Sequence, residues 1–459
     1  MEFISLLRQY EQDVLRDICE LVKIPSVADR QSAGEGAPFG QEVARALDWY
    51  LNRASEMGFA VKNVGGYAGH VEYGEGEELL GVLVHLDVVP PGPGWQSDPF
   101  GAAMDGEKIV GRGVVDDKGP AVISLYALKA LQESGVALTK RIRIIAGTDE
   151  ENGMHCVEHY FQQEEKPTLG FSPDGDFPLI YAEKGLLHLK VSWQGQGPLQ
   201  SLHGGERPNI VPQVAEARVR LEDLPPDWER LLLQEKDLSA EAEEGVLKIR
   251  AQGRSAHASV PEQGRNALVP LLESLCSLEL QEQQKPLQFL SRLGRGINGE
   301  GLEISFADEI SGKLTCNLGM LRFSSGQGEA VIDIRSPVSV KLEEVLEAAR
   351  KALLGAGFDV EVLEFDPPHY LSKDSGLVRS LLAVYRDVTG DTQDAMAIGG
   401  ATYARKLDKG VAFGPLLPGR EDVAHTANEY ILLQDVKVCL EIYARAMYKL
   451  AGRSHPAKS

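Results

Sequence analysis

Histidines and carboxylates follow apolar segments of this 459-residue sequence in a pattern typical of a metal site. Imidazole and carboxylate together form the ligand set that zinc prefers, with manganese or cobalt as alternatives. Carboxylates in such sites also serve as proton carriers. In chain order, the residues concerned are His85, Asp87, Asp116, Asp117, Glu150, Glu151, Asp174 and His425.

Each of these residues alone also has an ordinary structural interpretation. A histidine at a strand end is more often simply hydrogen-bonded than bound to metal, and Asp116 or Asp117 could cap the helix that follows. Each remaining acid could lie in a solvated loop. The metal interpretation depends on the whole set, because many negative charges at one sheet edge are unfavourable unless cations compensate them.

The elements that must position these residues alternate between strand and helix. Apolar residues recur at helical spacing over 3–22, and further helices are expected over 40–58 and 120–134. The apolar runs in 78–90 and 141–151 predict strands buried on both faces. In such an α/β layer, ligands bind beyond the carboxyl ends of the strands, where these acids and histidines lie. Period-two alternation would let Asp87 orient the His85 ring.

The pattern changes twice along the chain. Alternating strand-like segments begin near Leu186, and helical periodicity returns near Ser375. We therefore expect a mixed α/β sheet flanked by helices in a catalytic domain of 1–185 and 371–459, with an inserted α+β lid domain at 186–370. The lid exceeds the ~100–150 residues usual for one module, so two subdomains are expected. The tail from Gly452 looks disordered.

Composition narrows the classes of function and the compartment. Forty-seven basic and 68 acidic residues give a formal charge of −21, which argues against nucleic acid or anionic lipid as a partner. Five scattered cysteines form neither a disulfide framework nor a thiolate zinc site. The sequence shows no signal peptide or membrane span, so a cytoplasmic protein is expected.

Several motifs carry a family resemblance that extends over nearly the whole chain. HLDVVP, GRGVVDDKG, GTDEE, SPD and a late histidine resemble the dinuclear zinc peptidase family of ArgE, DapE and carboxypeptidase G. Within it, GFSPDGDFP, GGERPNIVP, GRSAHASVPEQGRNAL and GGATYAR are similar to the PepV-type dipeptidases. The resemblance implies two zinc ions per chain, one held by His85 and Asp174, the other by Glu151 and His425, with Asp116 bridging both. It makes Glu150 the general base, with Asp87 fixing the His85 ring.

The same resemblance assigns substrate contacts to the lid and to one loop. His257 would stabilise the oxyanion, Asn209 and Arg335 would bind the substrate carboxylate, and Gly400 would lie near the substrate. Ala401 departs from the third glycine frequent in relatives, which makes substrate fit near Gly400 less certain. The ordinary alternatives are a surface-loop histidine at His257 and a solvated strand charge at Arg335.

The resemblance implies a dipeptidase that hydrolyses the amide bond of small peptides by a metal-activated water. One alternative keeps the chemistry but acts on N-acyl amino acids, as deacetylases and desuccinylases of the family do. A second alternative, a non-catalytic binding protein on the same fold, conflicts with a complete ligand set. In relatives with shorter lids the oxyanion histidine comes from a partner subunit, whereas PepV-like lids carry a second subdomain, so the resemblance implies a monomer.

Overall fold

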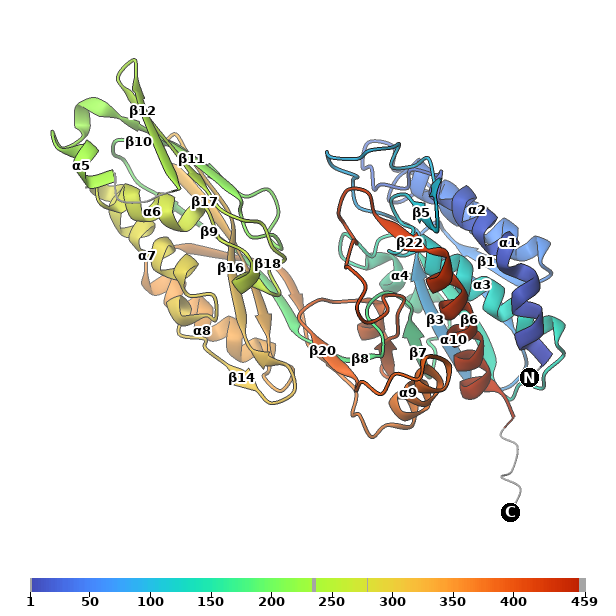
Figure 1. Ribbon diagram of the computed structural model, residues 1–459. Helices are drawn as coiled ribbons and strands as arrows, with labels where there is room; N and C mark the ends of the chain where they lie inside the picture. The colour runs from blue at the N-terminus through green and yellow to red at the C-terminus, as the bar shows by residue number, and fades with distance from the viewer. Residues whose placement is uncertain (1, 233–236, 279, 454–459) are drawn as a thin grey trace. The chain divides into compact units, whose positions relative to one another are not determined.

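The computed structural model describes residues 2–232, 237–278 and 280–453, and the chain divides into two compact units (Figure 1). Unit 1 comprises Met1–Tyr181, Leu371–Met396 and Thr402–Ser459. Unit 2 comprises Ala182–Tyr370 and Ala397–Ala401.

Unit 2 differs from the predicted lid at 186–370 in two ways: it begins at Ala182, and it includes the short segment Ala397–Ala401. The segment has no periodicity of its own, and its assignment depends on packing. A Cβ added to Gly399 would lie 2.6 Å from Cβ of Ser259, so the two backbones lie in close contact. The predicted disordered tail falls outside the described residues from 454 onward.

A mixed sheet forms the centre of unit 1, in the strand order β1-β2-β6-β3-β7-β21-β8-β19, with β20 also paired with β8. Its strands are β1 (Ala60–Val64), β2 (Ala68–Tyr73), β3 (Leu79–His85), β6 (Arg141–Gly147), β7 (Leu169–Ser172), β8 (Ile180–Glu183), β19 (His369–Tyr370), β20 (Met396–Ile398) and β21 (Gly410–Ala412). The neighbours β6, β3, β7 and β21 run parallel. Every residue of β3 is buried, as predicted for a strand covered on both faces.

The helices of unit 1 pack on this sheet or on one another. They are α1 (Glu2–Val22), α2 (Gln41–Glu56), α3 (Lys118–Glu133), α4 (His155–Gln163), α9 (Gly376–Thr389) and α10 (Leu433–Ala451). Helices α3 and α10 contact each other and both central strands β3 and β6, and α9 contacts α10. Helix α3 begins two residues before the predicted start at Pro120, because a proline fits the first turn, where its missing N–H is not needed.

A small sheet connects two distant parts of unit 1. It consists of β4 (Ala103–Asp105), β5 (Lys108–Val110) and β22 (Tyr430–Leu432). The pairing of β22 with β5 brings the chain before Tyr430 close to the loop before α3. The chain from Tyr430 onward thus lies beside elements from its first part.

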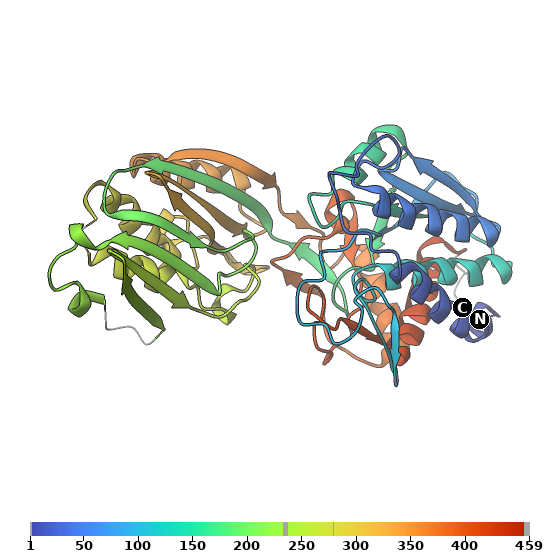
Figure 2. The same cartoon turned by 90° about the horizontal axis from the view of Figure 1, so that it is seen from above.

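Unit 2 contains an antiparallel sheet (Figures 1 and 2). Its strand order is β12-β13-β11-β10-β16-β17-β9-β18. The strands are β9 (Gly185–Gln194), β10 (Leu199–Gly204), β11 (Val214–Arg220), β12 (Leu238–Glu243), β13 (Val246–Gln252), β16 (Thr315–Ser324), β17 (Gln327–Ser336) and β18 (Asp359–Asp366). A separate hairpin has β14 (Ala307–Asp308) and β15 (Gly312–Lys313), and the helices are α5 (Trp228–Leu232), α6 (Leu268–Cys276), α7 (Gln284–Arg295) and α8 (Leu342–Gly355).

The sheet of unit 2 has two halves joined where β10 pairs with β16. Strands β10 to β13 lie on one side of this pair, and β16, β17, β9 and β18 lie on the other. Both halves contribute to one hydrophobic cluster with the helices. The expectation of two subdomains stays a prediction.

The predicted fold class is confirmed: a mixed sheet flanked by helices, with an α+β second unit. None of the helices in the described part of the chain combines the length and the apolar character needed to cross a bilayer.

Candidate metal centre

The candidate ligands lie where the parallel strands of unit 1 end. Strand β3 ends at His85, and β6 and β7 end shortly before Glu151 and Asp174. Asp116 lies just before α3, and His425 lies in the loop that leads to β22. Because carboxyl ends of parallel strands meet at one sheet edge, residues far apart in the sequence come together there.

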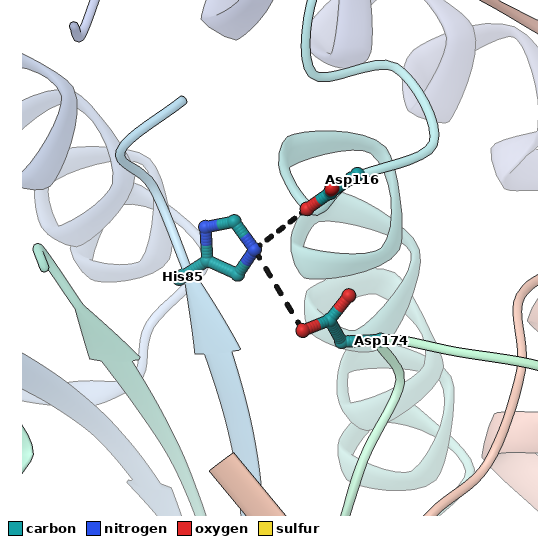
Figure 3. A group of neighbouring side chains, drawn as sticks. All are labelled: His85, Asp116 and Asp174. Atoms are coloured by element: carbon teal, nitrogen blue, oxygen red, sulfur yellow. Dashed lines mark hydrogen bonds and ion pairs between the residues drawn. The ribbon is translucent and has the colours of Figure 1, made fainter. Parts of the chain in front are cut away.

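The ring of His85 is fully buried, and its two nitrogens make different contacts. Nδ1 lies 2.9 Å from the backbone oxygen of Asp87, which can only accept, so Nδ1 carries a proton. Nε2 lies 2.8 Å from Oδ1 of Asp116 and 3.8 Å from Oδ2 of Asp174 (Figure 3). In a neutral ring Nε2 is also an acceptor. The converging lone pairs therefore require a proton or a metal ion between them.

Asp116 lies between two histidines. Its Oδ1 contacts His85, and its Oδ2 lies 2.9 Å from Nε2 of His425. The same Nε2 lies 3.1 Å from Oε1 of Glu151. Two groups of ligand-type atoms, each within 4.8 Å of one another, thus share the Asp116 carboxylate. These are the groups His85, Asp116, Asp174 and Asp116, Glu151, His425.

Burial and mutual repulsion destabilise the negative charges here. Burial and the charge of Asp116 raise the pKa of Asp174 to about 7, and the same two causes raise the pKa of Glu151. Burial disfavours a charged His425, but the charges of Glu151 and Asp116 outweigh it and raise its pKa to about 11. Divalent cations would relieve this excess of negative charge, and the oxygen and imidazole donors are ones that zinc accepts.

Glu150 lies at the same sheet edge but is held differently. Its Oε1 is buried and has no hydrogen-bond partner among the described residues. Burial, followed by the charge of Asp174, raises its pKa well above the ordinary value for a glutamate. An unsatisfied buried carboxylate oxygen beside both ligand groups is suited to accepting a proton.

Asp87 contacts the site in a different way from the prediction. The carbonyl of Asp87, rather than its carboxylate, lies at hydrogen-bond distance from the His85 ring, and Oδ1 is 3.6 Å from Nδ1. The carboxylate accepts hydrogen bonds from the backbone N–H groups of Glu150 and Glu151, at 3.1 and 3.2 Å. Asp87 therefore fixes the loop after β6 as well as the ring.

Asp117 does not act as the helix cap considered from the sequence. It stands at the N-cap position of α3, but its side chain makes no capping hydrogen bond. Its Oδ2 accepts a hydrogen bond of 3.0 Å from the backbone N–H of His85. Asp117 is fully buried and fixes the end of β3.

Glu429 is a residue that the sequence analysis missed. It is fully buried and accepts hydrogen bonds from Nη1 of Arg112 at 2.6 Å and from the N–H groups of Gly113 and Val115. These bonds fix the loop that presents Asp116. The only available signal was an acid four residues after His425, which has no periodic meaning in a loop.

The predicted substrate-binding residues of the lid lie together within unit 2. Ile210 forms a bridge with His257, and the N–H of Ala258 donates to the backbone oxygen of Asn209 at 2.9 Å. Nδ1 of His257 lies 2.6 Å from Oγ of Ser259. The loops that carry Asn209 and His257 are therefore held as one piece.

Arg335 joins this group through the segment Ala397–Ala401. Its Nη1 donates to the backbone oxygen of Gly399 at 3.3 Å. Arg335 is only 4% exposed, so the alternative of a solvated strand charge is wrong. The close backbone contact falls at Gly399 and not at Gly400, where an added Cβ would meet only Ile398, at 3.4 Å.

Comparisons with known proteins give the family. The model of "Peptidase family M20/M25/M40" matches residues 81–449. A Bacillus subtilis protein described as a "putative dipeptidase" is 42% identical over 466 residues, covering 98% of this chain and 99% of that protein. A Staphylococcus haemolyticus protein with the same description is 38% identical over 461 residues, covering 97% and 98%.

Solved structures share the fold. Human carnosine dipeptidase 1 superposes with a TM-score of 0.62 at 15% identity, over 98% of this chain and 99% of that one. An M20 family metallo-carboxypeptidase of Sulfolobus solfataricus gives 0.62 at 18% identity, over 95% and 99%. From the match of the family model and the identity to its relatives, this chain belongs to peptidase family M20/M25/M40.

Proposed function

We propose that this chain is a metal-dependent dipeptidase. The observation that carries the proposal is the pair of ligand groups that share Asp116, with the unsatisfied carboxylate of Glu150 beside them. The description of full-length relatives as dipeptidases supports the choice of substrate. The related alternative of an N-acyl amino acid deacylase has no comparable support.

We assign two metal ions per chain, zinc in the first instance, with manganese or cobalt as substitutes. His85 and Asp174 would hold one ion, and Glu151 and His425 the other. Asp116 would hold both, because each of its oxygens already faces a different histidine. Asp87 holds the His85 ring in position through its carbonyl, and it holds the Glu150 loop through its carboxylate.

The chain's own residues perform the remaining steps of peptide hydrolysis. Divalent ions held by these ligands would supply Lewis-acid polarisation of the scissile carbonyl and would lower the pKa of a water. Glu150 accepts the proton of that water and then delivers it to the leaving amine. Asn209 and Arg335 bind the substrate carboxylate, Arg335 through paired N–H donors, and the loop at Gly400 borders the substrate.

One experiment tests the proposal directly. Metal content and turnover of a dipeptide are measured on the same purified protein, before and after chelation, with an N-acetyl and an N-succinyl amino acid as parallel substrates. We expect dipeptide hydrolysis that disappears with the metal and returns when zinc is added back. Hydrolysis of the N-acyl substrates alone would favour the deacylase, and bound metal without any turnover would favour a binding protein.

We assign stabilisation of the developing oxyanion to His257. His257→Ala should lower kcat about 10²–10³-fold, as loss of one oxyanion donor does, with a smaller change in KM. Steady-state kinetics on a dipeptide measures both values. Ser259→Ala removes the hydroxyl 2.6 Å from Nδ1 but keeps the imidazole, so it serves as a control with a milder effect. An unchanged kcat for His257→Ala would exclude this role.

We propose that the enzyme works as a monomer. Strand β16 of the same chain already pairs with the edge of β10, leaving no place there for a partner's strand. Sedimentation at assay concentration should give a single chain, and a mixture of His257→Ala and Glu150→Ala proteins should stay inactive. Activity restored by mixing would show that His257 acts across subunits.

We also propose a cytoplasmic location, which the five free cysteines support.

A further inference from the structure

A chain of alternating charges surrounds Arg335 in unit 2. Nε and Nη2 of Arg335 donate to Oδ1 and Oδ2 of Asp333 at 2.8 and 2.7 Å. On its other side Asp333 lies 2.9 Å from Nε2 of His188, whose Nδ1 lies 2.8 Å from Oε2 of Glu364. Asp333 is fully buried and Arg335 nearly so, whereas the side chain of Glu364 is 36% exposed.

The hydrogen bonds of Arg335 leave two donors of its guanidinium group without an acceptor among these contacts. A guanidinium has five N–H donors in a rigid plane. Asp333 accepts two of them side-on, and the backbone oxygen of Gly399 accepts one from Nη1. One donor on Nη1 and one on Nη2 are left by these bonds. Two such donors are what a carboxylate needs for a bidentate contact.

Asp333 and His188 both stay charged near neutral pH. Burial opposes ionisation of Asp333, but the charge of Arg335 and the hydrogen bond with His188 hold its pKa well below the usual range. Burial likewise disfavours a charged His188, but hydrogen bonds with Asp333 and Glu364 raise its pKa to about 9. Arg335, Asp333 and His188 thus keep a net positive charge together, because His188 offsets Asp333. Water screens the exposed Glu364 more strongly.

We propose that Asp333 is a positioning residue for substrate selection. It orients Arg335 so that the remaining N–H donors on Nη1 and Nη2 recognise a free substrate carboxylate. His188 restores the positive charge that Asp333 would otherwise cancel. The proposal rests on the proposed function, in which Arg335 binds that carboxylate. It extends substrate recognition to two residues that contact no substrate themselves.

The test compares a dipeptide that has a free C-terminal carboxylate with the same dipeptide amidated. The readout is the ratio of the two kcat/KM values, measured on one preparation. In Asp333→Asn the new amide group turns an N–H donor toward a guanidinium that needs two acceptors, so the side-on contact is lost. We expect the ratio to fall about 10- to 100-fold, mainly through KM of the free-carboxylate substrate, as expected for losing one charged partner.

Asp17→Asn is the matched control. Asp17 is also a buried aspartate that accepts from an arginine, Nε of Arg53 at 2.5 Å, and from a hydroxyl, that of Tyr126 at 2.7 Å. It lies on α1 of unit 1, outside both the metal centre and the lid. The control should lower stability without changing the ratio, which separates a positioning effect from a general loss of packing.

The possible results separate failure of the positioning role from failure of the proposed function. An unchanged ratio in folded Asp333→Asn, beside a collapsed ratio in Arg335→Ala, would overturn the positioning role and leave the proposed function intact. A ratio near one in the wild-type enzyme would exclude carboxylate recognition itself. The absence of any dipeptide hydrolysis would contradict the proposed function. If Asp333→Asn does not fold, His188→Gln decides: a ratio lowered about 3- to 10-fold supports the proposal, and an unchanged ratio overturns it.

Discussion

Replacing Glu150 with alanine is expected to lower kcat by on the order of 10²–10⁴, the contribution of a general acid–base residue, while both metal ions stay bound. The reason is that Glu150 has a buried oxygen without a hydrogen-bond partner among the described residues, and it belongs to neither ligand group. Elemental analysis of the purified variant gives the metal content, and dipeptide turnover gives kcat.

The neighbouring variant Glu151→Ala is the control for this assignment. Glu151 faces His425 and belongs to the second ligand group, so its loss should remove a metal ion as well as activity. If Glu150→Ala loses metal and Glu151→Ala keeps it, the two roles are reversed. Full activity in both variants would place the active site elsewhere.

Replacing Asp116 with alanine is expected to have the largest effect on metal binding. Each of its oxygens faces a different histidine, so removal of one side chain takes a ligand from both groups. Substitution of a residue that hydrogen-bonds to a metal ligand already costs about 10- to 100-fold in metal affinity. Loss of a ligand shared by two ions should therefore cost at least as much at both positions. Elemental analysis after gel filtration should find neither ion at full occupancy, and turnover should be lost.

Asp174→Ala separates a shared ligand from a ligand to one ion. Asp174 belongs only to the group with His85 and Asp116, so this variant should lose one ion and retain the other. Two ions retained at full occupancy in Asp116→Ala would contradict the bridging role. Equal losses in the two variants would show that the ions bind cooperatively.

The sequence carried enough information to predict that the candidate ligands lie together, because these residues follow strong local signals. Strand β3 is an uninterrupted apolar run that ends at His85, and β6 ends in a glycine followed by acids. Burial on both faces requires such runs, and the sheet then brings their ends to one edge. The atom of Asp87 that contacts the His85 ring could not be predicted, because a sequence does not distinguish a backbone carbonyl contact from a carboxylate contact.

The supporting residues could not be predicted in the same way. Glu429 accepts from Arg112, a residue 317 positions earlier in the chain, and Asp333 contacts His188 across neighbouring strands. Neither acid stands in a pattern that distinguishes it from a solvated charge. Their roles follow from tertiary pairing, which periodicity within one segment does not encode.

The segment Ala397–Ala401 makes unit 2 discontinuous in the sequence. Because of it, the polypeptide passes between the two units four times rather than twice. A transplant of 182–370 into a relative would carry Ser259 and Arg335 but not Gly399, so both residues would face the recipient's own segment instead. Chimaeras between members of the family therefore need to exchange both stretches together.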